Sequence, residues 1–393
     1  MVFRRGASIP SFRESCFSVS NGIVWREQKN FALHVMRDLG FGKTRMEVHI
    51  KEEIAHLLSE LEEFEGKAAN VRRYLAPSTS NNISALIFGR RLDYHDPMRM
   101  KLDEVITELI RFFRPTSLHA WFPGIKTLLF KLKLFDYDKL EYAIKHLLIF
   151  IAKEIDEHEA TLDSNSIRDY MDGFLLQMKQ REYKDPNTSF TKAMLKGNSP
   201  SLIGAGSTTV RATMEWSMLS MAEYQDVQKR IHAEIDDVVG RERTPDWADH
   251  VSMPYTEAVL MEIQRWKTVV PINLLRYTTE DAKVSGYDIP AGMTTIANIH
   301  AIHNDPTSGM SRTNSSRRGS FPKMARKWSR TNAGFLSHWV KGLVLERLWP
   351  TLSCSCTSRC CCKNSTLFSQ KAKDTVSKEE LEQLSNLFPT NCV

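Results

Sequence analysis

The sequence predicts a mainly α-helical fold with minor β structure, followed by a C-terminal tail that is largely disordered. Through most of residues 1–306, apolar side chains recur every three or four positions, which is the period of an amphipathic helix. Segments typical of β-strands appear only near residues 283–298. Beyond residue 306 the sequence is polar and basic with little apolar periodicity, so it cannot bury enough apolar surface to offset its chain entropy.

The distribution of charge and cysteine divides the chain at the same point. The formal net charge is +6, yet residues 307–393 hold 14 Lys and Arg against 5 Asp and Glu, which leaves 39 against 42 for residues 1–306. Six of the 7 cysteines also lie in the tail. We therefore expect a folded part over residues 1–306, a separate tail over residues 307–393, and no nucleic-acid partner for the folded part.

No segment is apolar for long enough to predict a membrane span. The longest candidate, HLLIFIA at residues 146–152, falls far short of the roughly 20 residues that a spanning helix needs. The first residues, MVFRRGASIPSF, contain no signal-peptide core. The sequence predicts a chain without a membrane anchor, although contact with a membrane surface stays open.

The helical period predicts the following order of elements. Helices are expected at residues 25–39 (stopped by Gly40), 47–64, 102–113, 140–158, 166–179, 202–222, 225–239 and 255–267. Short strands are expected at residues 283–287 and 293–298, separated by the turn DIPAG, and a short helix at residues 377–387.

Glu262 and Arg265 are a first candidate for function. Residues three apart on a helix lie on the same side, so this pair can form a charge-assisted, bidentate contact. An ordinary surface ion pair is the alternative, since such pairs are common and weak.

Two other segments have unusual local chemistry. Ala205, Gly206, Thr208 and Thr209 lie within AGSTT, inside an apolar helix where glycine costs roughly 1 kcal/mol relative to alanine. Either a ligand or a tightly packed neighbouring helix would explain the small residues. Residues 25–26, Trp-Arg, offer an indole N–H and a guanidinium to an anion, or simply form a solvated helix start.

Taken in order, these motifs resemble those of a microsomal-type cytochrome P-450. The resemblance rests on the WREQ helix, the AGSTT helix, and the EIQR helix followed by PINLLRYTTED, GYDIPAG and HNDP. It covers residues 2–306, from the family's B–C region to just after its K helix and the strands that follow. The resemblance implies a fragment of the cytochrome P-450 fold in which the membrane anchor, the proline-rich hinge and the first strands are missing.

The resemblance assigns cofactor-binding roles to five residues. Trp25 and Arg26 match the family's contact with one haem propionate, and Arg276 matches a second propionate contact. Glu262 and Arg265 match the buried ion pair behind the haem. The implied cofactor is haem b, with its iron.

It also assigns catalytic roles to the AGSTT helix. Ala205 and Gly206 match small residues that leave room for dioxygen, and Thr209 matches the hydroxyl that steers protons to it. The family usually has an acid where this chain has Thr208, so protons would have to pass through water or another group.

The family's cysteine loop, F-x-x-G-x-R-x-C-x-G, and its P-E-R-F segment are absent from residues 307–393. Reading the tail from the third base of each codon permits W-D-E-P-D-K-F-L-P-E-R-F, and then P-F-S-L-G-K-R-x-C-L-G-E-T-L-A. Both motifs appear in family order. We interpret the tail as family sequence read out of frame, with the slip between Pro306 and Ser308.

The same interpretation explains LSCSCTSRCCCK at residues 352–363, because codons for Leu, Phe and Tyr become Cys and Ser when displaced by one base. A metal cluster is the alternative, but paired C-x-x-C spacing and accompanying histidines are lacking. We interpret His300 and His303, spaced H-x-x-H, as structural. The LHAWFPGI loop at residues 118–125 fits either membrane contact and substrate entry or simple aromatic packing.

Two functional classes follow from the resemblance. The first is a haem-dependent monooxygenase that inserts one oxygen atom of O2 into a lipophilic small molecule, such as a xenobiotic, steroid or fatty acid. Its implied electron donor is NADPH–cytochrome reductase, and its implied location is the cytosolic face of the endoplasmic reticulum membrane. The second is an inactive fragment without the cysteine thiolate that binds the iron. A third possibility is a haem-free binding protein that retains the helical half.

Overall fold

The computed structural model describes residues 16–304, apart from residues 19, 42–43, 66–69, 113–136, 186, 274–275 and 285. The predictions for residues 307–393, including the helix at 377–387, and for the loop at 118–125 lie outside the described residues. Within these, the chain forms two compact units. The first contains the described parts of Met1–Met46, Thr79–Thr208 and Leu274–Ile296, and the second those of Glu47–Ser78, Thr209–Asn273 and Ala297–Val393.

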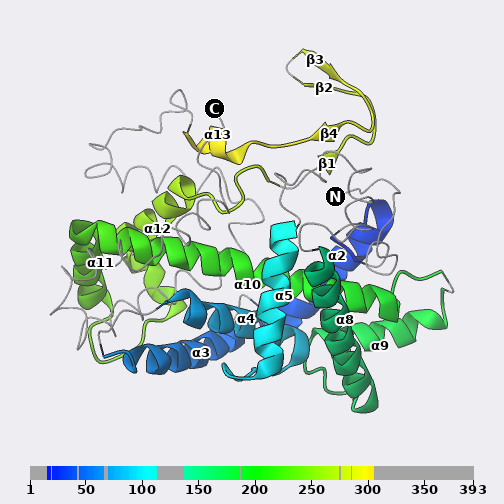
Figure 1. The fold of residues 1–393 in the computed structure, drawn as a ribbon, viewed down its shortest axis with the longest axis horizontal. Coiled ribbons are helices and arrows are strands. Elements are labelled where there is room, and N and C mark those ends of the chain that lie inside the picture. The colour runs from blue at the N-terminus through cyan, green and yellow to red at the C-terminus, as the bar shows by residue number, and fades with distance from the viewer. Residues whose placement is uncertain are drawn as a thin grey trace. The chain divides into compact units, whose positions relative to one another are not determined.

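Helices dominate both units, which confirms the mainly α fold with minor β structure (Figure 1). The helices are α2 (Gly22–Asp38), α3 (Thr44–Glu62), α4 (Arg72–Phe88), α5 (Pro97–Phe112), α8 (Tyr137–Ala160), α9 (Tyr170–Glu182), α10 (Lys192–Glu223), α11 (Gln225–Val238), the 3-10 helix η1 (Trp247–Ser252), α12 (Pro254–Trp266) and α13 (Ile299–Asn304).

The core of the first unit includes an aromatic cluster between α2 and α9. The ring of Phe31 on α2 lies 5.6 Å from that of Phe174 and 5.0 Å from that of Phe190, both edge-on. Gly173 allows this close approach, since a Cβ there would lie 2.9 Å from Cγ1 of Val35. In the same unit, α5 packs along α8.

Helix α4 was not predicted from the sequence, because Pro77 and the polar run STSNN are typical of a loop. Its polar side chains are nevertheless buried. Asn81 is 2% exposed, and its side chain replaces a missing backbone partner: Nδ2 donates to the carbonyl of Leu92 at 2.8 Å, while Oδ1 accepts from the Leu92 N–H at 3.2 Å. Buried polar groups are tolerated where they are hydrogen-bonded.

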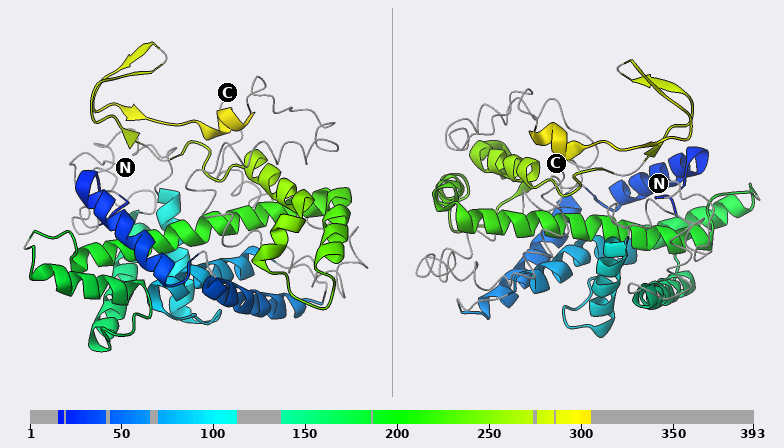
Figure 2. Two further views of the ribbon diagram at one scale, coloured as in Figure 1. Left: turned by 180° about the vertical axis from the view of Figure 1, so that it is seen from behind. Right: turned by 45° about the horizontal axis from the view of Figure 1, so that its top comes forward.

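The strands form two short antiparallel pairs in the first unit. β1 (Arg276–Tyr277) pairs with β4 (Thr294–Thr295), and β2 (Ala282–Val284) pairs with β3 (Tyr287–Ile289) as a hairpin (Figure 2, yellow). The prediction of a single strand at residues 283–287 is therefore wrong, because these residues belong to two paired strands. The chain reverses at Gly286, whose φ of +88° suits a glycine in a tight turn.

No helix in the described ranges combines the length and the apolar character needed to cross a membrane.

Candidate functional site

Helix α12 carries the Glu262–Arg265 pair, and its start is fixed by α11. Pro254 occupies the first turn, where its missing N–H costs nothing. The next two N–H groups donate to the carboxylate of Glu234 on α11, Tyr255 at 2.9 Å and Thr256 at 2.7 Å, and the Thr256 hydroxyl donates to it at 2.6 Å. A carboxylate at a helix N-terminus also interacts favourably with the helix dipole.

Glu262 and Arg265 form a bidentate ion pair. The Nε and Nη2 atoms of Arg265 each donate to one Glu262 oxygen at 2.6 Å. Arg265 is 15% exposed and Glu262 27%, so the pair is half-buried, which favours more than an ordinary surface ion pair. The hydrogen bond to Glu262 raises the pKa of Arg265 despite partial burial, so the guanidinium stays charged.

A third donor of Arg265 binds the backbone near the end of the described chain. Nη1 donates to the carbonyl of His303 in α13 at 2.7 Å. The Thr268 hydroxyl donates to the Arg265 carbonyl at 2.8 Å and therefore accepts from Nδ1–H of His303, also 2.8 Å away. Burial and the nearby charge of Arg265 lower the pKa of His303, so its ring is neutral at pH 7.

These contacts agree with a structural interpretation of the H-x-x-H pair. His303 bonds Thr268, and His300 lies 3.3 Å from the Asn304 amide. Among the described residues, neither histidine belongs to a group of three or more ligands close enough to share a metal ion.

The small residues on α10 have separate explanations. Gly206 is buried, and a Cβ there would lie 3.0 Å from Cγ1 and 3.2 Å from Cδ1 of Ile83 on α4. Tight helix packing therefore accounts for Gly206. Ala205 is exposed, so a role beside a ligand stays a prediction for it.

The threonines of α10 are partly exposed. The Thr208 hydroxyl donates to the Gly204 carbonyl at 2.7 Å, and the carbonyl of Thr209 accepts from Thr213 at 2.9 Å. Because the Thr208 hydrogen is committed to the backbone, its oxygen is left as an acceptor. The predicted role of Thr209 in proton transfer stays a prediction.

Gly206→Ala is expected to lower the free energy of unfolding by about 1 kcal/mol, since the strain against Ile83 exceeds the gain in helix propensity. In an Ile83→Ala background the same change should instead raise it by up to about 1 kcal/mol. Urea unfolding of the four proteins measures this coupling. Gly204→Ala is the control on the same helix, because its nearest neighbour, Cγ2 of Ile106, is 4.0 Å from the added Cβ. Equal effects at both glycines would contradict the packing explanation.

The predicted anion-binding residues lie on two elements of the first unit. Trp25 and Arg26 are exposed near the start of α2, and Lys29 lies over the Trp25 ring at 4.6 Å. Arg276 is exposed on β1, opposite Thr295. Their N–H groups could donate to an anion, although binding a propionate stays a prediction.

The described residues fit a haem only in part. Exposed cationic and indole donors suit its propionates. A cysteine ligand for the iron is not offered in the same way. Cys16 is the one cysteine among the described residues. It is fully buried, and its thiol contacts the hydroxyls of Ser201 at 2.8 Å and Ser18 at 2.9 Å. These residues offer no accessible thiolate.

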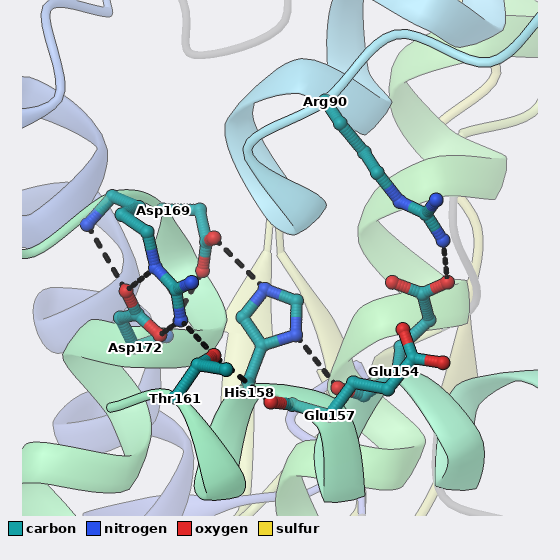
Figure 3. Close-up of polar contacts among 8 residues, drawn as sticks. Arg90, Glu154, Glu157, His158, Thr161, Asp169 and Asp172 are labelled. Carbon is teal, nitrogen blue, oxygen red and sulfur yellow. Dashed lines mark hydrogen bonds and ion pairs between the residues drawn. The ribbon is translucent and has the colours of Figure 1, made fainter.

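Sequence reasoning missed a buried charged cluster where α8 ends and α9 begins (Figure 3). His158, Asp169 and Asp172 bring potential metal-ligand atoms within 4.8 Å of one another. The cluster is already satisfied without an ion, since the carboxylate of Asp172 is bound by Arg168 at 2.6 and 2.8 Å, and that of Asp169 by His158 at 2.9 Å. The sequence RDYMD could have predicted part of this cluster, because an Asp three residues before another acidic residue is typical of a helix start, and Asp169 is the N-cap of α9.

Comparison with known proteins decides the family. The family model described as Cytochrome P450 matches residues 7–308. The chain belongs to this family. Among curated P450 relatives, it is 34% identical over 292 residues to cytochrome P450 2J5 of Mus musculus, 32% identical over 298 residues to cytochrome P450 2J2 of Homo sapiens and 35% identical over 297 residues to cytochrome P450 2F3 of Capra hircus.

These alignments place the chain as part of a P450 sequence. They cover 73%, 75% and 73% of this chain but 57%, 58% and 58% of the respective relatives. The resemblance inferred from the ordered motifs is confirmed at the level of the family.

Proposed function

We propose that the chain carries the helical part of a haem-dependent monooxygenase site, which inserts one atom of O2 into a lipophilic small molecule. The observation that carries this proposal is the partly buried, bidentate Glu262–Arg265 pair on α12, in a chain whose family match extends over residues 7–308. When bound, haem b supplies the redox-active iron that this chemistry needs.

The chain's own residues would bind and orient this group. The indole N–H of Trp25 and the guanidinium groups of Arg26 and Arg276 are the donors for its propionates. Ala205 offers a small, exposed side chain on α10, and Thr209 offers a hydroxyl one helical turn further along. Thr208, where the family usually has an acid, holds its proton on the Gly204 carbonyl, so a water molecule would have to supply the proton relay.

The partners follow from the same proposal. Electrons would come from NADPH–cytochrome reductase at the cytosolic face of the endoplasmic reticulum membrane. The substrate would be lipophilic, as a xenobiotic, steroid or fatty acid is.

A second candidate is that the chain as encoded is catalytically inactive. It is favoured by the sequence after residue 306, which contains no F-x-x-G-x-R-x-C-x-G loop, and by Cys16, whose thiol is buried and hydrogen-bonded. Without a cysteine thiolate on the iron, the electron donation that favours O–O cleavage is lost.

Two versions of the protein distinguish these candidates: the chain as encoded, and a chain whose reading frame is restored by one base between Pro306 and Ser308. We expect the restored chain to bind haem and, when reduced under carbon monoxide, to give the red-shifted Soret band of thiolate ligation. The chain as encoded should lack that band. Trp25→Phe and Arg26→Ala in the restored chain should weaken haem binding.

The possible results separate the candidates. A thiolate band from the encoded chain would contradict the second candidate. Absence of haem binding from both chains would contradict the first. Sequencing genomic DNA and transcript across residues 305–309 shows which version the gene encodes.

A further inference from the structure

The junction between α8 and α9, which we call the α8–α9 junction, is built from His158, Asp169 and Asp172 (Figure 3), and from Arg168, which binds Asp172. His158 lies in the last turn of α8 and is 8% exposed, while Asp169 and Asp172 are 1% and 0% exposed. Asp169 is the N-cap of α9, and its Oδ1 accepts from the Asp172 N–H at 2.9 Å. The same carboxylate therefore holds both the start of α9 and the His158 ring.

Both ring nitrogens of His158 face hydrogen-bond acceptors. Nε2 lies 2.9 Å from Oδ2 of Asp169, and Nδ1 lies 2.6 Å from the backbone carbonyl of Glu154. Neither oxygen can donate, since one is a carbonyl and the other belongs to a carboxylate that also accepts from a backbone N–H. A neutral imidazole carries only one N–H, so both contacts together require the doubly protonated ring.

The charges around the ring lead to the same state. Asp169 and Asp172 carry two negative charges, and Arg168 carries one positive charge, bound to Asp172 at 2.6 Å. A protonated His158 makes the junction neutral, whereas a neutral ring leaves one uncompensated buried charge.

The other charged groups near the ring are paired among themselves. Arg90, which follows α4, binds the buried carboxylate of Glu154. Glu157 on α8 lies 3.4 Å from Lys153, and both are exposed. None of these pairs supplies the positive charge that the two aspartates need beyond Arg168.

The pKa of His158 follows from these surroundings. Burial alone lowers it, but the hydrogen bond and charge of Asp169, with smaller contributions from the Glu154 carbonyl and Asp172, raise it above the ordinary 6.5. A histidine whose pKa is higher in the folded than in the unfolded protein stabilises the fold most at pH below 6.5. That stabilisation is lost as pH rises through the folded value.

We infer that the α8–α9 junction is a proton-dependent contact, intact while His158 is doubly protonated and loosened when the ring loses one proton. Loss of the proton removes either the bond to Asp169 or the bond to the Glu154 carbonyl, and it leaves Asp169 and Asp172 with a single counter-charge. The start of α9 then loses part of its anchorage to α8. This property is independent of haem and of the proposed oxidation.

The test is a pH titration of the full chain with isotope-labelled histidine, followed by NMR of the ring signals. We expect His158 to titrate above 6.5 in the unaltered protein. In Asp169→Asn, which keeps a good helix cap but removes the charge, we expect at least a tenfold loss of proton affinity. The matched control is His146→Gln, also on α8, whose half-buried ring bonds the Tyr142 carbonyl. This change should leave the His158 titration as it is.

Hydrogen exchange of the same proteins gives the second readout. After correction for intrinsic exchange, the Asp172 amide should lose protection between about pH 6 and about pH 8.5. His158→Gln should remove that pH dependence, whereas His146→Gln should not. The inference is overturned if His158 titrates at or below 6.5, or if protection of α9 is the same at both pH values. If neither junction variant folds, the titration of the unaltered protein decides alone.

Discussion

Arg265→Ala is expected to lower the free energy of unfolding by about 2–3 kcal/mol, somewhat less than for a fully buried ion pair. The change removes both bonds to Glu262 and the bond to the His303 carbonyl. It also leaves the Glu262 carboxylate, 27% exposed, without its cation. Urea unfolding monitored by circular dichroism measures the loss.

Two further variants show whether geometry or charge matters. Arg265→Lys keeps the charge but cannot reproduce the bidentate contact, so about half of the loss should remain. Arg241→Ala breaks an exposed pair with Asp236, whose side chains are 76% and 37% exposed, and should cost less than about 1 kcal/mol. Equal losses for Arg265→Ala and Arg241→Ala would mean that burial of the α12 pair contributes nothing.

Gly89→Ala should be similarly damaging, at about 3 kcal/mol, for two reasons that act together. Gly89 follows α4 with a φ of +66°, where an L-residue is strained by about 1 kcal/mol. An added Cβ would also lie 2.8 Å from Oδ2 of Asp169. That oxygen cannot easily move, because Asp169 is held by His158 and by the Asp172 N–H.

Gly240→Ala is the matched control for strain. Gly240 also follows a helix and has a φ of +76°, but an added Cβ would meet nothing within 4 Å among the described atoms. We expect a loss of about 1 kcal/mol there, due to the backbone alone. If urea unfolding gives equal losses at the two glycines, the contact with Asp169 has no energetic weight.

The helices with a clear apolar period were predictable from the sequence. Residues 225–239 and 255–267 were predicted almost to their ends, as α11 and α12, because apolar side chains recur in each at helical spacing. In the structure α11 buries only Ile231 and Ile235, whereas most residues of α12 are buried. The Glu262–Arg265 contact was predictable for a related reason, since a spacing of three on a helix fixes which side chains meet.

Other features depend on contacts between distant residues and could not be read in this way. Helix α4 contains Pro77 and a polar run, so its sequence does not predict a helix. The burial of that run depends on distant partners such as Leu92. Helix α10 begins at Lys192, ten residues before the predicted start, although it contains Pro200. The α8–α9 junction joins residues 158 and 169, and only the fold shows that both ring nitrogens of His158 face oxygen atoms.

The contact between Arg265 and the His303 carbonyl has a consequence for how this gene tolerates damage. A backbone carbonyl is present whichever amino acid is encoded, and position 303 lies before the proposed slip at residues 306–308. A mutation that changes every codon downstream therefore leaves the third donor of Arg265 with its acceptor. Products of this gene that are truncated or frame-altered after residue 304 should keep α12 and α13 joined, so they should resist cellular proteolysis in this region better than products that end before residue 299.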